Sequence, residues 1–311
     1  MNKKKILISG AGGSIFPYLF GALEEKYDIY AMDSDEKIGL IYPNKNIIIS
    51  PKVDDPKFND QIGKIIDDYN IDYYISGIDE EILKAIEIGK DKNISVLSPC
   101  SDFVKVSLDK YELMKSLKDL GISDIPTVMA DQYTGQFDYP IFLKPNVGRG
   151  SRGIKKIESL DQFEAYFILE EYEKSEVLVQ PYIGGDEYTV SVTVNNLNDL
   201  MAVVPKLVFT KQGITRHAIS IQNEKIVEKC RDIVNKMKPY GTFNVQLKIY
   251  NEEIYIFEIN PRISTTLVLS VESGVNEIDL MIEYFDKKYS KKLCEFSSIN
   301  LVRRWENCFY E

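Results

Sequence analysis

The sequence predicts an α/β protein whose first hundred residues form a parallel sheet and whose remainder is α+β with antiparallel sheets. Near the N-terminus, short β-branched runs alternate with helical segments, as in parallel sheets. Two glycine-rich loops each come directly after an apolar strand pattern. In the second half, paired segments alternate apolar and polar residues with period two, which is typical of half-buried antiparallel strands.

The composition is that of a soluble globular protein with room for two domains. Of the 311 residues, 44% are hydrophobic and 28% are charged. The net charge of −10 argues against nucleic acid or an anionic membrane as the main partner. No apolar stretch approaches the ~18 residues that a membrane-spanning helix needs. The four cysteines form no CxxC pair, so we expect reduced thiols in a cytoplasmic protein.

The first hundred residues carry the parallel-sheet pattern. Their basic start leads into an apolar run that glycines soon interrupt, which favours a first strand over a signal peptide. Strands are expected over 6–9, 29–32, 73–76 and 95–97, and helices over roughly 15–26, 55–70 and 80–91. Such alternation predicts right-handed crossovers between parallel strands.

A glycine loop, Gly10–Ser14, lies between the first strand and the first helix, where backbone N–H groups can face an anion. Asp33 ends the second strand, where dinucleotide-binding folds place a ribose acid, but Ile15 replaces the third glycine of that fingerprint. Tyr111 and Lys115 have the spacing of short-chain dehydrogenases and also fit an ordinary amphipathic helix. The pattern favours a tight strand-to-helix turn and leaves an NAD-dependent sugar dehydrogenase or dehydratase as the alternative.

The middle of the chain predicts a phosphate-binding cover. A buried strand, 139–145, carries a single lysine, Lys144, near its end and runs into the glycine loop 146–153. A strand at 154–157 follows. A Walker loop would need GxxxxGK[ST] before a helix, and neither is present. Glycine-rich backbone can still close over phosphates, with Lys144 as a point charge. The alternative is a hairpin with a basic surface turn.

An adenosine site is expected at the next strand end. The strand 177–183 meets an acidic glycine loop, 184–187, and a second strand covers 188–194. Backbone groups around Gln180–Ile183 could read the adenine edge, and Glu187 could hold ribose hydroxyls.

The segment 241–262 predicts a hairpin with one polar face. Strands over 243–250 and 254–260, joined by a three-residue turn at 251–253, would place Gln246 opposite Glu258 and Asn244 opposite Asn260. The opposite face is expected to carry Phe243, Val245, Leu247, Tyr255, Phe257 and Ile259. Hard oxygen ligands with Arg262 beside them suit Mg²⁺ carrying phosphates, whereas the alternative is a polar face that meets only water.

These elements, in this order, resemble the ATP-grasp superfamily, and in particular single-copy relatives of the carbamoyl-phosphate synthetase large subunit. The motifs are Ser107–Lys110, Ile141–Pro145 with its glycine loop, Gln180–Glu187, Asn244–Gln246 and Glu258–Arg262. The resemblance implies a Rossmann-like pre-ATP-grasp domain over 1–97 and an ATP-grasp domain over 98–311. The latter would comprise a small lid subdomain at about 125–180, a C-terminal subdomain at about 181–290 and a tail at 291–311, where a final edge strand near 300–305 is expected.

The resemblance also implies a role for each site residue. The phosphates of ATP would meet Lys110 and Lys144 and be covered by Gly148, Gly150, Ser151 and Gly153. The adenosine would meet Gln180, Tyr182, Ile183 and Glu187. Two Mg²⁺ ions, with Mn²⁺ as an alternative metal, would be held by Gln246, Glu258 and Asn260. Arg262 and Lys144 would be catalytic, and Arg262 would also contact the substrate. Apart from the resemblance, Arg216 follows Lys211-Gln212-Gly213 in a stretch expected to line the substrate cleft, which makes it a candidate anchor for the substrate carboxylate.

The implied reaction is ATP-dependent ligation: a carboxylate is activated as an acyl phosphate, and an amine or another nucleophile attacks it. ADP and phosphate are the products, and the partners are small molecules, with a homodimer left open. The chain holds one ATP-grasp unit, so a glutaminase partner does not carry over. An ATP-binding sensor without turnover is the non-enzymatic alternative, because binding and catalysis would use the same residues.

Overall fold

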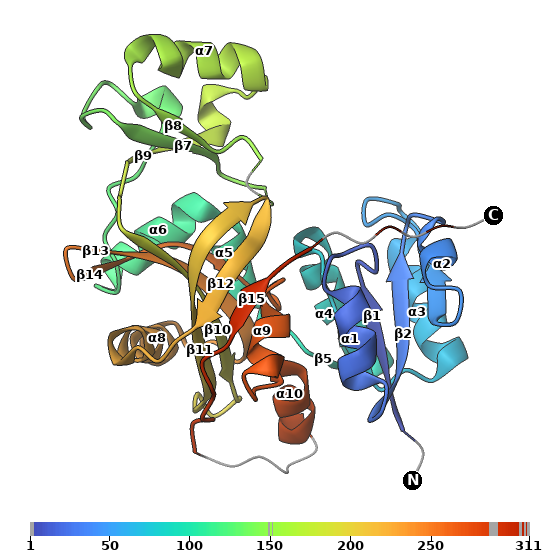
Figure 1. Ribbon diagram of the computed structural model, residues 1–311. Helices are drawn as coiled ribbons and strands as arrows, with labels where there is room; N and C mark the ends of the chain where they lie inside the picture. The colour runs from blue at the N-terminus through green and yellow to red at the C-terminus, as the bar shows by residue number, and fades with distance from the viewer. Residues whose placement is uncertain are drawn as a thin grey trace.

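The computed structural model describes residues 3–148, 150, 152–285, 292–304, 307 and 309. These residues form three sheets, of five, six and four strands, which Figure 1 shows as separate layers along the chain. The first sheet is parallel and the other two are antiparallel, as the sequence predicted.

The parallel sheet has the strand order β3-β2-β1-β4-β5. Its strands are β1 (Lys4–Ser9), β2 (Tyr27–Asp33), β3 (Asn46–Ile49), β4 (Tyr73–Ile75) and β5 (Ser95–Val96). The helices of this region are α1 (Phe16–Leu23), α2 (Ile38–Ile41), α3 (Phe58–Tyr69) and α4 (Ile82–Lys92), and the 3-10 turn η1 is Asp79–Glu81. The edge strand β3 and the short helix α2 were not predicted.

The period-two alternation of β1 gives this sheet two cores. Ile6 and Ile8 pack with α1 on one face, where residues of α9 (Leu267–Glu272) and α10 (Glu277–Phe285) join them. Leu7 packs with α3 and α4 on the opposite face. Because α9 and α10 follow the C-terminal hairpin in the chain, the first core joins the parallel sheet to the C-terminal part of the molecule.

The four-stranded sheet has the order β6-β9-β7-β8 and stands at the top of Figure 1 beneath α7. Its strands are β6 (Val128–Met129), β7 (Ile141–Pro145), β8 (Lys155–Ile157) and β9 (Val177–Pro181). The other elements here are α7 (Leu160–Glu170), η2 (Ala130–Gln132) and η3 (Lys174–Glu176). β7 and β8 are antiparallel and flank the glycine loop, so the predicted strand–loop–strand order is confirmed.

The six-stranded sheet has the order β14-β13-β10-β11-β12-β15. Its strands are β10 (Asp186–Val194), β11 (Leu200–Gln212), β12 (Ile214–Ser220), β13 (Gly241–Tyr250), β14 (Glu253–Asn260) and β15 (Asn300–Val302). The helices α5 (Ser101–Leu108), α6 (Lys110–Asp119) and α8 (Glu224–Met237) contribute to the core on one face. The expected edge strand of the tail is confirmed for 300–302, whereas Trp305 lies outside the described residues.

The hairpin β13–β14 has the predicted pairing at the site, but its turn and its regularity differ from the prediction. Asn244 faces Asn260 and Gln246 faces Glu258. The turn has two residues, Asn251 and Glu252, both with positive φ as in a type I′ turn, and not three. A register shift next to Gln246 supplies the missing offset, so the pairing at the site is unchanged.

The same shift changes which side chains line the cavity. Ile256, not Phe257, pairs with Leu247 and enters the core. Tyr255 and Phe257 line the cavity described below, so their predicted place on the face away from the polar residues is wrong. The reason is the bulge, which interrupts the period-two alternation.

Among the described residues, no helix combines the length and apolarity that crossing a membrane requires. The domain boundaries expected from the sequence, including 97/98 and the lid over 125–180, remain predictions.

Candidate active site

A cavity of about 470 Å³ lies between the four-stranded sheet and the six-stranded sheet. Segments from 110 to 265 contribute to its walls, so residues far apart in the sequence meet in it. The predicted site residues that line the cavity are Lys110, Lys144, Gly148, Gly150, Gln180, Tyr182, Ile183, Glu187, Gln246, Glu258, Asn260 and Arg262. The structure thus brings most of the predicted site together in one place.

Two described residues of the predicted site, Gly153 and Arg216, do not line this cavity. Ser151 lies outside the described residues. Gly153 has a positive φ, and a Cβ there would come within 2.7 Å of Tyr172, so packing alone requires glycine at this position. Arg216 lies one residue beyond Thr215, which does line the cavity.

Two buried lysines mark one end of the cavity. Lys110 begins α6 and donates to the carbonyl of Gly148 at 2.8 Å, which ties the helix start to the glycine loop. Lys144 is the last residue but one of β7 and donates to the carbonyl of Phe257 at 2.8 Å. The pKa of Lys144 is lowered to about 7: burial is the largest cause, Glu258 opposes it, and the nearby charge of Lys110 adds to it. A buried ammonium of this kind gains most from an anionic ligand.

Aromatic and aliphatic side chains line another part of the cavity, which suits a flat heterocycle. They are Ile125, Phe142, Ile154, Tyr182, Ile183, Tyr255 and Phe257. The polar groups expected to read the base already have partners in the chain. Gln180 donates to Thr127 at 2.7 Å, the Tyr182 N–H donates to the Pro140 carbonyl, and Lys248 donates to the Ile183 carbonyl.

Lys211 is a cation of the cavity that the sequence reasoning did not assign. It stands at the end of β11 and donates to Glu187 and to the side-chain oxygen of Gln246, both at 2.9 Å. It therefore bridges the expected ribose ligand and an expected metal ligand. Its position in a basic stretch before a glycine was the available signal, but only the pairing of β11 with β10 brings it to Glu187.

The metal-binding residues can be tested by their donor chemistry. Glu258 offers a carboxylate and Asn260 an amide oxygen, both in the cavity, and hard oxygen donors of this kind fit Mg²⁺. The Gln246 oxygen accepts from Lys211, so its use as a ligand requires Lys211 to move. In the part of the chain that the structure describes, no cluster of three His, Cys, Asp or Glu side chains could hold a metal. Glu258 and Asn260 thus fit an ion, and the second ion expected from the sequence remains a prediction.

Arg262 is fixed by an acidic residue that comes from the parallel-sheet region. Its Nε donates to Asp79 Oδ1 at 2.6 Å and its Nη2 to Asp79 Oδ2 at 3.3 Å, a two-point contact between planar groups. Nη1 donates to the Ile263 carbonyl. Asp79 was not predicted as a site residue, because it precedes Arg262 by 183 positions in the chain and no local pattern links the two.

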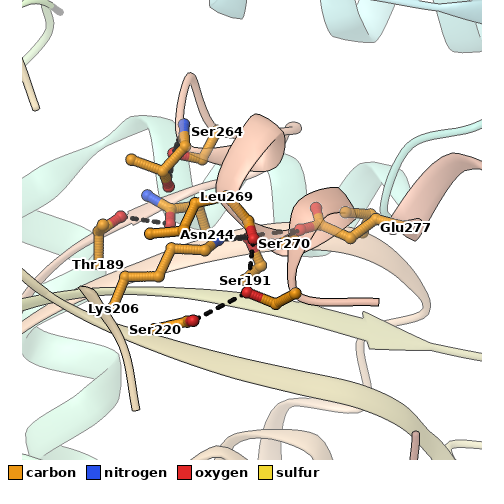
Figure 2. Close-up of polar contacts among 12 residues, drawn as sticks. Thr189, Ser191, Lys206, Ser220, Asn244, Ser264, Leu269, Ser270 and Glu277 are labelled. Carbon is orange, nitrogen blue, oxygen red and sulfur yellow. Dashed lines mark hydrogen bonds and ion pairs between the residues drawn. The ribbon is translucent and has the colours of Figure 1, made fainter. Parts of the chain in front are cut away.

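The polar face of the six-stranded sheet continues beneath α9 and α10, as Figure 2 shows. Thr189 donates to Asn244 at 2.7 Å, and the fully buried Lys206 donates to Ser191 at 2.6 Å and faces Glu277 at 3.9 Å. Burial lowers the pKa of Lys206 to about 8, and Glu277 opposes that shift. These contacts satisfy polar groups that the helices bury.

The glycine loop near the N-terminus is organised as a turn. The Gly12 N–H donates to Asp33 Oδ2 at 2.8 Å, and the Asp35 N–H donates to Asp33 Oδ1. A dinucleotide site would use the Asp33 carboxylate to bind ribose. Here that carboxylate instead accepts hydrogen bonds from the backbone of the glycine loop and of the turn after β2. Tyr111 and Lys115, the dehydrogenase-like pair, do not line the cavity. These contacts favour the tight turn over the dinucleotide site.

Comparisons of the sequence point to one superfamily. Residues 173–308 match a family described as "ATP-grasp in the biosynthetic pathway with Ter operon". The chain is 30% identical to a D-alanine--D-alanine ligase of Petrotoga mobilis over 40% of this chain and 47% of that protein. It is 21% identical to the carbamoyl phosphate synthase arginine-specific large chain of Halalkalibacterium halodurans over 82% of this chain but only 26% of that protein. A carbamoyl-phosphate synthase of Methanobrevibacter smithii is 22% identical, with 85% and 76% covered.

Solved structures show the same fold. The biotin carboxylase domain of Hydrogenobacter thermophilus 2-oxoglutarate carboxylase, in complex with MgADP and bicarbonate, has a TM-score of 0.77 at 15% identity, with 93% of this chain and 71% of that chain covered. The N5-carboxyaminoimidazole synthetase of Staphylococcus aureus, complexed with ADP, has a TM-score of 0.75 at 20% identity, with 95% and 81% covered. The motifs, the relatives and the fold all resemble those of ATP-grasp proteins: residues 173–308 match an ATP-grasp family, and the chain is similar to the carbamoyl phosphate synthase large chain over most of its length.

Proposed function

We propose that this protein is a Mg-ATP-dependent ligase that activates a carboxylate as an acyl phosphate for attack by an amine or another nucleophile. One observation carries the proposal: a single cavity holds two buried lysines, an aromatic wall, the Glu258–Asn260 pair and Arg262. Together they supply sites for phosphates, a base, a hard cation and a reacting anion. ATP-grasp relatives named as ligases support the reaction class.

Each residue then has a role in binding. Lys110 and Lys144 neutralise the phosphates, Gly148 and Gly150 lie over them, and the aromatic wall takes adenine. Glu187 takes the ribose hydroxyls once Lys211 has turned from it. Mg²⁺ held by Glu258 and Asn260 would neutralise phosphate charge and fix the phosphate orientation. We also propose that Gln246 helps to hold a second ion, and that Mn²⁺ can take the place of Mg²⁺.

The chemistry requires alignment more than covalent help from the protein. A carboxylate oxygen of the substrate bonds to the γ-phosphorus, and the bond from that phosphorus to the bridging oxygen of ADP breaks. Arg262, held in place by Asp79, faces the charge that develops on the phosphoryl group. The nucleophile then attacks the acyl carbon, loses a proton and expels phosphate. Water must be excluded until then, because it would hydrolyse the acyl phosphate.

A nucleotide screen by thermal shift tests the proposed ligand. Mg-ATP at a hundred times its dissociation constant should stabilise the protein by ~2.7 kcal/mol and raise the melting temperature, whereas NAD should not. ATP with EDTA in place of Mg²⁺ is the control for the metal. A shift with NAD and none with Mg-ATP would support the dehydrogenase alternative instead.

The glycine loop should close over bound nucleotide. Gly150 lies between β7 and β8 and has a positive φ, a conformation that glycine adopts readily, and glycine-rich backbone suits a cover that closes over a ligand. Amide exchange at 147–153 should be fast in the ligand-free protein and slow with Mg-ATP. Strong protection of these amides without nucleotide would contradict a closing cover.

ADP release separates a ligase from an ATP-binding sensor. The two alternatives share the cavity, but only a ligase should release ADP when a panel of carboxylates and amines is added to Mg-ATP. ADP release that depends on both a carboxylate and an amine would establish the ligase. Tight Mg-ATP binding without ADP release across the panel would favour the sensor.

A further inference from the structure

Arg262 keeps two N–H groups for a ligand, although most of its guanidinium is bonded within the chain. Nε and Nη2 donate to the two carboxylate oxygens of Asp79, and Nη1 donates to the Ile263 carbonyl at 3.2 Å. A guanidinium has five N–H groups. Among the described residues these bonds use three of them, which leaves one N–H on Nη1 and one on Nη2. Because Arg262 lines the cavity, this pair is available to an anion there.

Asp79 stands on a short segment that the parallel sheet anchors on both sides. Before it, the Gly77 N–H donates to the Ser9 hydroxyl at 3.1 Å, and a Cβ at Gly77 would come within 2.6 Å of the Ser9 carbonyl oxygen. The backbone therefore lies close against β1. After it, the buried Glu81 accepts a hydrogen bond from the Tyr74 hydroxyl at 2.5 Å. The Asp79 carboxylate is thus presented to Arg262 from a firmly packed support.

The parallel-sheet region reaches the active site through this contact. The described residues that line the cavity run from Lys110 to Thr265, and none of them belongs to the parallel sheet. The side chains of Arg262 and Asp79 are 18% and 11% exposed, so water competes little for their contact. A carboxylate beside Arg262 reduces the attraction of the guanidinium for an anion. The benefit of Asp79 to the site therefore lies in orientation and not in charge.

We infer that Asp79 is a positioning residue, which holds the guanidinium of Arg262 so that its two remaining N–H groups face the phosphoryl group in transfer. Donors stabilise a transition state most effectively when they are oriented before the reaction. A side chain that is already held also loses less rotamer freedom when it meets its ligand. The inference rests on the proposed function for the identity of the anion, and it makes phosphoryl transfer depend on the parallel-sheet region.

The test uses the whole protein and Mg-ADP, with and without aluminium fluoride, which binds next to ADP in place of the phosphoryl group. By calorimetry, Asp79→Asn should bind Mg-ADP as the native protein does. Its affinity for the aluminium fluoride complex should be lower by about tenfold or more, because the guanidinium is displaced. Electrostatics alone predicts the opposite sign, since the substitution removes a negative charge beside the anion. Asp79→Glu keeps the charge, and its affinity should lie between those of Asp79→Asn and the native protein.

Asp72→Asn is the matched control at the other end of β4. Asp72 accepts from the Lys5 N–H at 2.8 Å and pairs with Lys4 at 3.2 Å. This variant should bind the aluminium fluoride complex as the native protein does. In Arg262→Ala, adding Asp79→Asn should cause no further loss of affinity for the complex, because a residue that acts only through Arg262 then has nothing to position.

The Nε–H signal of Arg262 in ¹⁵N NMR reports the contact itself and is assigned by its absence in Arg262→Ala. In the native protein this proton should exchange slowly with water, both alone and with Mg-ADP and aluminium fluoride. It should exchange fast in Asp79→Asn. If Asp79→Asn does not fold, the native protein still decides. Fast exchange there, with or without the complex, would show that Asp79 does not hold Arg262.

The outcomes separate this inference from the proposed function. Equal affinity of native protein and folded Asp79→Asn for the aluminium fluoride complex would overturn the positioning role and leave the ligase proposal standing. The same holds if native protein binds Mg-ADP but gains no affinity from aluminium fluoride. Native protein that does not bind Mg-ADP would contradict the proposed function. In that case, slow Nε–H exchange that becomes fast in Asp79→Asn would keep Asp79 as the residue that orients Arg262.

Discussion

Replacing Arg262 by alanine is expected to leave Mg-ATP binding nearly unchanged and to reduce ADP formation by about a hundredfold or more. The guanidinium faces the charge that appears on the transferring phosphoryl group, so its loss removes ~3 kcal/mol or more of transition-state stabilisation. The measurements are the Kd of Mg-ATP by calorimetry and the rate of ADP release with substrate. A native rate in Arg262→Ala would show that this segment is not the active site of an ATP-grasp enzyme.

The ion pair with Asp79 provides the control for folding. Arg262→Ala leaves a carboxylate whose side chain is only 11% exposed without its partner, and this is expected to lower the melting temperature. Adding Asp79→Asn removes that unpaired charge and should restore part of the stability without restoring activity. Recovery of ADP formation in the double variant would mean that the first loss came from folding and not from catalysis.

Replacing Glu258 by glutamine is expected to weaken both Mg-ATP binding and turnover. The substitution keeps the size of the side chain but removes the charge that attracts Mg²⁺ to the phosphates. A loss of at least about tenfold in Mg-ATP affinity is expected, on the scale known for altered metal surroundings. Calorimetry at increasing Mg²⁺ should show partial rescue at most.

Glu252→Gln is the matched control on the same hairpin. Glu252 lies in the turn, pairs with Lys225 and is 87% exposed, far from the Glu258 end of β14. The control should bind Mg-ATP and release ADP as the native protein does. Equal affinity of Glu258→Gln and Glu252→Gln for Mg-ATP would remove Glu258 from the metal site.

The sequence predicted the polar hairpin because the apolar alternation and the Glu-Ile-Asn-Pro-Arg segment are local signals. Its register at Gln246 and Glu258 was right, but the mechanism behind that register was not. Asn251 and Glu252 make a tight turn without any glycine, and a bulge restores the offset. A bulge depends on how a strand packs against its neighbours, so alternation along one strand does not reveal it. Tyr255 and Phe257 were misplaced for that reason.

Other residues were missed because their positions depend on contacts between distant segments. Asp79 reaches Arg262 across 183 positions of the sequence. Arg303 reaches Thr265 only because β15 pairs with β12 at the edge of the six-stranded sheet. Lys211 reaches Glu187 through the pairing of β11 with β10. The alternation of apolar and polar residues along the chain indicates where the strands are. Which charged side chains meet depends on how distant strands pair and pack.

A crystal structure of the protein with Mg²⁺ and a non-hydrolysable ATP analogue tests the central claim most directly. We expect the nucleotide in the cavity between the two antiparallel sheets, with its phosphates against Lys110 and Lys144 and its metal against Glu258 and Asn260. The base should lie on the aromatic wall that includes Phe142 and Tyr182. Nucleotide bound instead at the Gly10–Ser14 loop, with this cavity empty at saturating ligand, would contradict the account.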